Sequence, residues 1–530
     1  MCFLLNLKNN LIKSPMCRET YTIKYDVFWK PNQPEGTWKM PSKKVVVIGA
    51  GVGGLSAAAL LAKNGFEVEV VEKTEEPGGR ARVWKKDGFV YDMGPSWYLM
   101  PEIFENFFNE FGKSVADYYK LLRLDPNYRI FFDSNDIVEI TANLETNLET
   151  FERLETGGAT KLQEYLDKAE ETYEYMMKGI MYEDLSSIWS MFSPKLMRAG
   201  SKLHIFSNID KWVRKFFSSD RARKILEYPI VFLGGNPKNT PALYSIISHI
   251  DYNLGVWYPL GGLGMIPEAL LRLSTANGAT VRFGVEATQI NVENSHAKTV
   301  QTTQGPINAD LVVVNADYPF AETQLLESKY QTYPSSYWEK KIIAPSAFVL
   351  YLGFDKKLDQ LTHHNVFLEY DWVQHFDQIF DAPAWPDKPA YYVCCPSRFD
   401  DSVAPKGKEN IFVTVPISPG IEDTPQLREA YFDKILSHME KLMGESLRDS
   451  MVVKRIFSLN DFAQDYNAYK GTAVGLTHTF RQSAFFRPRH KSKKVKNLYY
   501  SGQYTHPGIG VPMALVSSQI VAEQITIKHA

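Results

Sequence analysis

A glycine-rich turn between an apolar β-type run and a small-residue helical run constrains the fold of this chain more than any other feature. The run Lys43–Ile48 (KKVVVI) is typical of a buried parallel strand, and Leu55–Asn64 (LSAAALLAKN) of a helix that ends at Gly65. A second apolar run, Phe66–Glu72 (FEVEVVE), predicts another strand. Strand, helix and strand in this order predict a βαβ unit, and therefore an α/β fold with a parallel sheet.

The turn itself (GAGVGG) has the glycine spacing of a dinucleotide-binding site. Gly49 permits the tight turn, Gly51 lets the backbone approach a diphosphate, and Gly54 allows close packing of helix on strand. We expect the diphosphate at the helix N-terminus, where free N–H groups and the helix dipole favour negative charge, with Gly53 as a further contact. Glu72 ends the next strand, where a carboxylate accepts hydrogen bonds from ribose hydroxyls and repels a 2′-phosphate.

A second glycine pair followed by an arginine favours FAD over NAD. In the segment PGGRA, Gly78 and Gly79 let more backbone approach the cofactor, and Arg80 adds a cation near the diphosphate. Nicotinamide-dependent dehydrogenases do not need these residues at this place. Gly94, in YDMGP, supplies another tight approach. We therefore predict that the cofactor is FAD.

The end of the chain predicts a second group of cofactor contacts. Asn497–Ser501 (NLYYS) is typical of a last buried strand, and a closing helix is expected from about Pro512, a favourable first-turn residue. The N-terminus of that helix is expected to face the flavin and to stabilise negative charge that develops on reduction. The candidate contacts here are Gly502, Gly510, Val511 and Pro512, together with Val285 at the end of the predicted strand Thr280–Val285.

His506 is the titratable side chain of the loop before the closing helix. It is the candidate catalytic residue, as acceptor of a proton, and a structural hydrogen bond in the loop is the competing interpretation. No Ser–His–Asp order, paired carboxylates or metal-spaced histidine cluster is evident, so we predict no metal site. Four aromatic residues are candidates to line a tunnel, with core packing as the alternative for each: Trp97, Tyr98, Trp257 and Tyr258.

The order of these segments predicts a cofactor domain with a substrate domain inserted into it. Residues 101–225 are expected to be mainly helical, Leu311–Val314 a further strand of the first domain, and Ala344–Asp355 a strand of a second sheet. Residues 1–40 are expected to form a loose extension or to result from an upstream start codon. We assign 41–120, 225–320 and 480–530 to a discontinuous FAD-binding domain, and 121–224 and 321–479 to a substrate-binding, membrane-facing domain.

Charge and cysteine content restrict the partners and the compartment. With 59 basic and 61 acidic residues among 530, the chain has no global field to attract nucleic acid, so none is expected as a partner. Its four cysteines include an adjacent pair, Cys394 and Cys395, which suits neither an ordinary disulfide nor a CxxC site. The long apolar stretch Val45–Ala62 is broken by the turn glycines, so we predict no transmembrane helix. A cytoplasmic location is therefore expected.

Together these motifs resemble the bacterial and archaeal phytoene desaturases, a carotenoid desaturase family of FAD-dependent, amine-oxidase-like flavoproteins. The resemblance extends from Val45 to about Ala522, and Pro241–Leu263 is its most specific part because dinucleotide-binding proteins at large do not share that segment. Ser517-Ser518 departs mildly from the Ser-Gly of many members. The pieces that carry the resemblance include GAGVGG, EKTEEPGGRA, YDMGPS, SAFVLYLGFD, GTAVGLTHTFRQSAFFRP and NLYYSGQYTHPGIGVPMALVSS.

The resemblance implies a Rossmann-type FAD domain of the amine-oxidase and glutathione-reductase-like group, with a sheet-and-helix substrate domain. It implies non-covalent FAD and an acyclic carotenoid, phytoene or a close derivative, that loses a hydride to the flavin from an allylic CH2–CH2 unit. Oxygen or a quinone would be the electron acceptor. The segment THPGIGVPM also resembles relatives that act on hydroxylated or elongated carotenoids, so the exact substrate stays open. A carotenoid isomerase, polyene reductase, terminal oxidase, flavin amine oxidase or non-catalytic prenyl-binding escort protein are the alternatives.

Because carotenoids dissolve in bilayers, we expect peripheral docking on a membrane. Ile188–Phe217 mixes aromatic with basic residues, as interfacial helices do, and Arg487–Lys496 (RPRHKSKKVK) is a strongly basic run. The alternatives are a pair of covering helices for the first segment and a solvated loop for the second.

Overall fold

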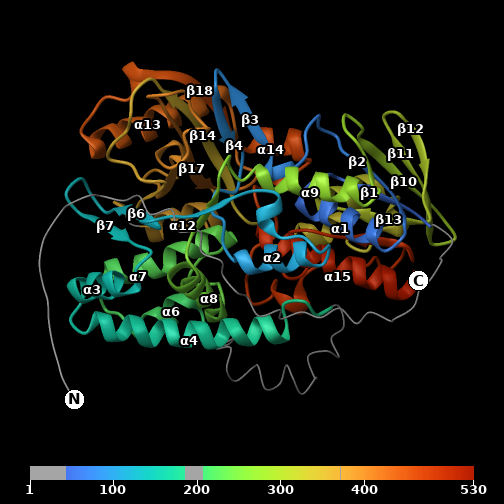
Figure 1. Cartoon of the computed structure of the whole chain (residues 1–530), viewed down its shortest axis with the longest axis horizontal. Helices are drawn as coiled ribbons and strands as arrows, with labels where there is room; N and C mark the ends of the chain where they lie inside the picture. Colours follow the sequence, from blue (N-terminus) through green and yellow to red (C-terminus); the bar gives the residue numbers. More distant parts are fainter. Residues whose placement is uncertain (1–42, 186–206, 371, 530) are drawn as a thin grey trace, which may run out of the picture.

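The computed structural model describes residues 43–185, 207–370 and 372–529. The expected extension, residues 1–40, lies outside this part of the chain, as does the portion of Ile188–Phe217 that ends at residue 206. Figure 1 shows a sheet flanked by α1 (Val52–Lys63) and α15 (Val511–His529) on the right and a second sheet under α13 (Pro425–Met443) at the upper left. A layer of helices at the lower left contains α3 (Leu144–Leu154), α4 (Gly158–Gly179), α6 (Ile209–Val213), α7 (Asp220–Glu227) and α8 (Ile246–His249).

The first sheet is parallel and confirms the predicted βαβ unit. β1 (Lys44–Ile48), α1 (Val52–Lys63) and β2 (Glu67–Val71) follow one another, and β1 pairs with β2 in the register Val45↔Val68. Its five strands stand in the order β19 (Leu498–Tyr500), β13 (Leu311–Val314), β1, β2 and β9 (Thr280–Arg282).

Two layers cover this sheet because its strands are apolar on both faces. Val45 and Val47 pack against α1, α9 (Met265–Ala276) and α15 (Val511–His529). On the opposite face Val46 and Ile48 pack against a three-stranded antiparallel sheet: β10 (Ala287–Glu293), β11 (His296–Thr302) and β12 (Gly305–Asn308).

The second sheet has seven strands and is mostly antiparallel. The predicted strand within Ala344–Asp355 is β14 (Ser346–Phe354), and helix α13 (Pro425–Met443) covers one face of the sheet. The strand order is β18 (Met451–Phe457), β14, β17 (Glu409–Ile417), β16 (Tyr391–Cys394), β15 (His364–Phe367), β6 (Tyr128–Phe131) and β7 (Ile137–Ile140).

The described part of residues 101–225 is largely helical, as predicted, but it also contains strands that were not predicted. These are β5 (Leu121–Arg123), β6 and β7, whose three- or four-residue lengths are too short to interrupt a helical pattern clearly. β5 pairs with β8 (Trp257–Pro259). The α-helices among the described residues of this stretch are α2 (Pro101–Asn109), α3 (Leu144–Leu154), α4 (Gly158–Gly179), α6 (Ile209–Val213) and α7 (Asp220–Glu227).

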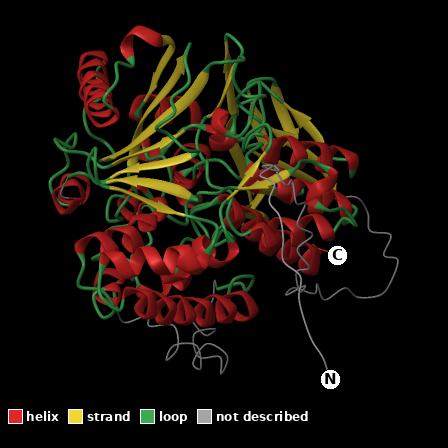
Figure 2. Ribbon diagram, turned by 60° about the vertical axis from the view of Figure 1, so that its left-hand side comes forward, coloured by secondary structure: helices red, strands yellow, loops and turns green. Residues whose placement is uncertain are grey.

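Figure 2 shows the helical layer below the sheets, with long helices lying across the lower half of the molecule. The strands of the first sheet all come from the three segments expected for the cofactor domain, and those of the second from the two segments between them. The exact boundaries stay a prediction. The remaining elements are β3 (Val83–Lys86), β4 (Phe89–Asp92), α8 (Ile246–His249), α10 (Tyr318–Phe320), α11 (Ser335–Trp338), α12 (Trp372–Phe380) and α14 (Leu459–Tyr466).

Candidate active site

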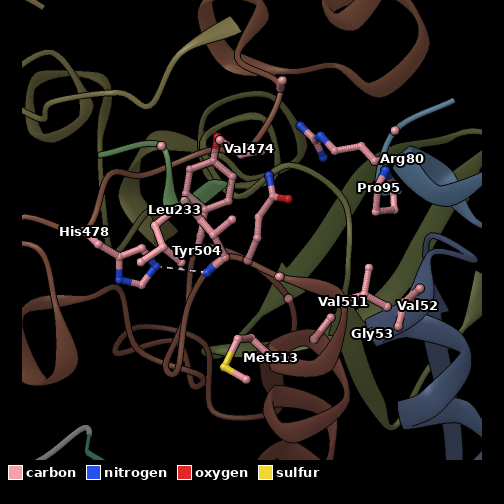
Figure 3. A pocket seen from close by; sticks show the side chains of 18 of the residues that line it. Val52, Gly53, Arg80, Pro95, Leu233, Val474, His478, Tyr504, Val511 and Met513 are labelled. Carbon is pink, nitrogen blue, oxygen red and sulfur yellow. Dashed lines mark hydrogen bonds between the residues drawn. The ribbon is translucent and has the colours of Figure 1, made fainter. Parts of the chain in front are cut away.

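A single large cavity, about 1400 Å³ in volume, joins the first sheet to the second. It exceeds the roughly 300–1,000 Å³ usual for a pocket that holds one drug-sized ligand. Figure 3 shows Val52, Gly53 and Val511 together on one side of the cavity and Leu233 and His478 on the other. Among the predicted site residues, those that line the cavity are Gly49, Gly51, Gly53, Glu72, Gly78, Gly79, Arg80, Gly94, Val285, Gly502, His506, Gly510, Val511 and Pro512.

Gly54 does not line the cavity, and its role is the close packing predicted for it. A Cβ atom on Gly54 would lie 2.0 Å from the carbonyl oxygen of Gly49, so only glycine lets α1 start so near the end of β1. Gly49 itself has a φ of 102°, which favours glycine. Gly94 is equally restricted, because its Cβ would lie 2.2 Å from the carbonyl oxygen of Arg80. Gly49 and Gly94 thus belong to a backbone cradle at one end of the cavity, and Gly54 packs behind it.

Asn315, which the sequence reasoning missed, lies against this cradle. Its Nδ2 donates to the carbonyl oxygen of Ser501 over 2.9 Å, and a Cβ on Gly51 would lie 2.7 Å from its Oδ1. Asn315 therefore joins the first turn to the C-terminal loop. A signal was present, because Asn315 directly follows the buried strand β13, and the carboxyl ends of parallel strands share the edge of the sheet where ligands bind.

The Glu72 carboxylate is already bound by the chain at both oxygens. Oε2 accepts from the Ala50 N–H over 2.7 Å, and Oε1 accepts from the backbone N–H and the hydroxyl of Thr74, each over 2.9 Å. A carboxylate offers about four acceptor positions, so capacity remains for hydroxyl groups of a ribose in the cavity that Glu72 lines. Glu72 thus also organises the turn, a structural role that the sequence reasoning omitted.

Arg80 reaches the cavity in a fixed orientation. Its Nη2 lies 3.4 Å from Oδ2 of the buried Asp317, and its guanidinium stands over the ring of Tyr466 with 5.4 Å to the centroid. The Tyr504 hydroxyl donates to the same Asp317 oxygen over 2.9 Å, while burial raises the pKa of Asp317. The charged head of Arg80 is thereby held at the cavity wall, where contact with a diphosphate stays a prediction.

The C-terminal loop leads directly into α15, as predicted. The helix begins at Val511 with Pro512 in its first turn, after Gly510 with a φ of 130°. The Gly502 N–H donates to the Ser517 hydroxyl over 2.9 Å, so α15 also fixes the start of the loop. The N-terminus of α15 therefore presents its free N–H groups at the cavity.

His506 makes the structural hydrogen bonds that were one interpretation of this residue. Its Nε2 lies 3.2 Å from the Ile180 carbonyl oxygen and 3.1 Å from that of Met181, and donates to both. Burial lowers the pKa of His506 to about 3, so the ring is neutral at pH 7 with its lone pair on Nδ1. A role as proton acceptor stays a prediction.

The polar end of the cavity fits FAD. Buried polar atoms there that have no hydrogen-bond partner within the described residues include Arg80 Nε, Gln503 Nε2 and His506 Nδ1. They accompany tight backbone turns that only glycine permits, a ribose-type carboxylate and a helix N-terminus, which together are the groups that bind a dinucleotide diphosphate.

The rest of the cavity is apolar and leads away from this end. Of the four candidate tunnel aromatics only Trp97 lines it, whereas Tyr98, Trp257 and Tyr258 are buried in the core beside it. The sequence does not single out most of the lining side chains because an apolar residue in a tunnel and one in a core look alike. They include Met176, Ile180, Leu243, Ile246, Ile247, Ile250, Val349, Val366 and Leu368.

Behind this apolar end lies a cluster that the sequence spacing did not reveal. Potential ligand atoms of His363, His364 and Cys394 all lie within 4.8 Å of one another, because β15 and β16 are neighbours. The Tyr392 hydroxyl, however, bonds to Nδ1 of His364, and burial raises the pKa of the Cys394 thiol. Nδ1 of His363 lies 3.3 Å from Nδ1 of His364, so we interpret the cluster as a buried hydrogen-bond network.

The basic run Arg487–Lys496 is only partly a surface segment. Arg487 is buried and donates to the carbonyl oxygens of Leu476, Gln482, Gln503, Tyr504 and Thr505, so the prediction that it contacts lipid is wrong. Lys493, Lys494 and Lys496 are exposed, and a role for them at a membrane stays a prediction. Within the described ranges, the search for a helix of sufficient length and hydrophobicity to traverse a bilayer found none.

Comparison with known proteins places the chain among flavoproteins. The model of the flavin containing amine oxidoreductases matches residues 52–526. Among solved structures, a putrescine oxidase variant superimposes with a TM-score of 0.61 at 15% identity, over 92% of this chain and 99% of that one, a likeness of fold alone.

Two curated relatives are much closer in sequence. The carotenoid 3,4-desaturase of Haloarcula japonica is 44% identical over 92% of this chain and 98% of its own length. The zeta-carotene-forming phytoene desaturase of Myxococcus xanthus is 35% identical over 92% of this chain and 95% of its own. Both alignments extend across the cofactor segments and the substrate segments alike.

Proposed function

Since the chain belongs to the flavin-containing amine oxidoreductases, and within them to the carotenoid desaturases, we propose that it desaturates an acyclic carotenoid with FAD as cofactor. Phytoene or a close derivative is the proposed substrate, and carotenoid biosynthesis the proposed setting. The observation that carries the proposal is the continuity of the cavity, in which a dinucleotide cradle opens into a long apolar space.

The apolar half of the cavity suits the substrate because a polyene chain offers no hydrogen-bonding groups. Its lining side chains orient the chain by shape and exclude water, which favours transfer between the substrate carbons and the cofactor. When bound, FAD accepts the hydride lost from an allylic CH2–CH2 unit. Loss of the hydride beside a polyene leaves a delocalised cation whose next proton is acidic, so a weak base suffices.

His506 is the proposed acceptor of that proton. Its ring is neutral, it lines the cavity, and its Nδ1 carries the free lone pair because Nε2 donates to the Ile180 and Met181 carbonyl oxygens. Its lowered pKa makes His506 a weak base, which suffices because the proton beside the delocalised cation is acidic.

The remaining partners are proposed on physical grounds. A carotenoid partitions into lipid, and we propose that the protein works at the cytoplasmic face of a membrane as a peripheral protein. Oxygen or a quinone is the proposed acceptor of the electrons from the reduced flavin. The apolar lining of the cavity suits an uncharged substrate, so an amine substrate is disfavoured.

Expression in a host that accumulates phytoene tests the function directly. We expect pigments whose absorption lies at longer wavelength, because each added conjugated double bond shifts the spectrum. Chromatography of the products separates desaturation from isomerisation, double-bond reduction or terminal oxidation. Unchanged phytoene in cells that contain flavin-loaded protein would contradict the proposal and leave a non-catalytic escort as the better interpretation.

A further inference from the structure

Two exposed aromatic side chains line the mouth of the apolar cavity. Phe480 is 41% exposed and Phe486 50%, and both also contribute to the cavity lining. A side chain that faces solvent and the cavity at once marks the place where the cavity opens. The segment between them supplies Arg481, Ser483, Ala484 and Phe485 to the same lining.

A third exposed apolar residue is tied to this segment. Ile342 is 47% exposed, its N–H donates to Oε1 of Gln482 over 2.9 Å, and its carbonyl oxygen accepts from Gln482 Nε2 over 2.9 Å. Ile342, Phe480 and Phe486 form what we call the mouth patch. Large apolar side chains exposed together are unfavourable in water and indicate a surface that is covered in use.

Basic side chains accompany the mouth patch. Arg481 lies beside Phe480 in the chain and is exposed, and Lys340 and the half-buried Lys341 precede Ile342. Glu339 is the acidic residue of this stretch. Basic side chains next to exposed apolar ones are the combination found on surfaces that insert into anionic lipid, and the acidic Glu183 and Asp184 lie further along, beside Leu185.

The mouth patch belongs to a firmly held segment. The buried Arg487 side chain binds carbonyl oxygens at Leu476 and Gln482 on one side and at Gln503 to Thr505 on the other. Ala484 and Phe485 pack against Ile180 and Leu185, beyond the end of α4. The exposed rings of Phe480 and Phe486 therefore lie on a segment that is firmly attached to the rest of the protein.

We propose that the mouth patch rests on an anionic lipid bilayer and forms the port through which the carotenoid enters the cavity. The inference rests on the proposed function, because a lipid-soluble substrate is what makes a bilayer the source. It differs from the expectation drawn from the basic run, since Arg487 anchors the port from inside the protein and the lipid contacts lie at residues before it. An apolar path then leads from the bilayer to the cofactor end without exposing the polyene to water.

The test compares two double variants of the flavin-loaded full-length protein. Phe480→Ser with Phe486→Ser removes the aromatic rings of the mouth patch. Ile137→Ser with Val452→Ser is the matched control, because these residues are 43% and 47% exposed and lie outside the cavity lining. Co-sedimentation with vesicles of phosphatidylcholine and phosphatidylglycerol measures binding, and flavin absorbance confirms that each variant is folded and loaded.

We expect at least a tenfold loss of vesicle partitioning for the mouth variant and no change for the control. Substrate dissolved in the vesicles should bleach the flavin of the control at the wild-type rate and that of the mouth variant at least tenfold more slowly. If the mouth variant partitions to vesicles like wild type, or if both variants lose partitioning equally, the proposal that the mouth patch is the entry port is wrong. Failure of wild-type flavin to bleach with any carotenoid, in vesicles or in detergent, would instead contradict the proposed function.

A second pair of substitutions checks the contribution of charge. Lys340→Gln with Arg481→Gln should remove most of the salt-sensitive part of vesicle binding and leave the part that persists in high salt. Binding by this variant that matches wild type at every salt concentration would overturn the proposed contact with anionic lipid.

Discussion

The two halves of the cavity are built from different kinds of atoms. The cofactor half consists of backbone held in tight turns, where a single added Cβ on Gly54 or Gly94 would meet a carbonyl oxygen at 2.0 or 2.2 Å. The substrate half consists of aliphatic and aromatic side chains from several helices and strands. Backbone positions accept few residues, whereas apolar side chains replace one another with small adjustments. We therefore expect substitutions to be tolerated poorly in the cofactor half of the cavity and well in the substrate half.

The largest expected effect is at Gly51. A Gly51→Val variant should contain no FAD, because its side chain enters the space before α1 and its Cβ lies 2.7 Å from Asn315 Oδ1. Flavin absorbance of the purified protein measures this. Adding Asn315→Ala removes the protein clash and separates the two causes. Restored flavin in the double variant would show that Gly51 serves the Asn315 contact and not the approach of the diphosphate.

An intermediate effect is expected at Glu72. Glu72→Ala should weaken FAD binding about 10- to 150-fold, since loss of a charged hydrogen-bond partner typically costs about 1.5–3 kcal/mol. It should also lower the melting temperature of the flavin-free protein, because the Ala50 and Thr74 N–H groups lose their acceptor. Titration with FAD measures the affinity, and Glu76→Ala, at an exposed position nearby, is the control. Unchanged affinity for FAD would show that Glu72 stabilises the turn and does not bind the cofactor.

The smallest effect is expected in the apolar half. Ile247→Leu keeps the volume of a lining side chain, so the free energy of unfolding should change by less than about 1.5 kcal/mol. Flavin content should stay the same, and KM for the carotenoid should change less than tenfold. Chemical denaturation and steady-state kinetics measure these quantities. Loss of flavin in this variant would break the contrast between the two halves.

The same contrast explains how much of the site was predictable. A dinucleotide turn needs glycine at fixed spacings, so Gly49, Gly51 and Gly54 were recognisable in the chain itself, and the βαβ unit followed from them. Asn315, Asp317 and Ser517 reach the same site from distant elements, and their positions depend on strand order that no local pattern encodes. The apolar lining was not predictable because composition does not separate a tunnel from a core.

Charge patterns were the least reliable guide. Arg487 belongs to a run that reads as a solvated or lipid-facing surface, yet it is buried among carbonyl oxygens that replace its hydration. Burial lowers the pKa of Arg487 only to about 10, so it remains charged inside the protein at neutral pH. Strand length was a separate limit. The strands β5, β6 and β7 were missed because three or four residues are too few to show the alternation of a β-strand.

The position of β19 at one edge of the first sheet sets the order of events during synthesis. β13 pairs with β19 along its open side, and α15 carries the last of the predicted cofactor contacts, so the cradle is incomplete until this helix has left the ribosome. At about 5–20 residues per second, β13 waits roughly 10–40 s for this partner. During that interval β13 presents an unpaired apolar edge, which invites aggregation. Loading with flavin must therefore follow the synthesis of β19 and α15, and we expect a riboflavin-starved cell to accumulate protease-sensitive chains that include both elements.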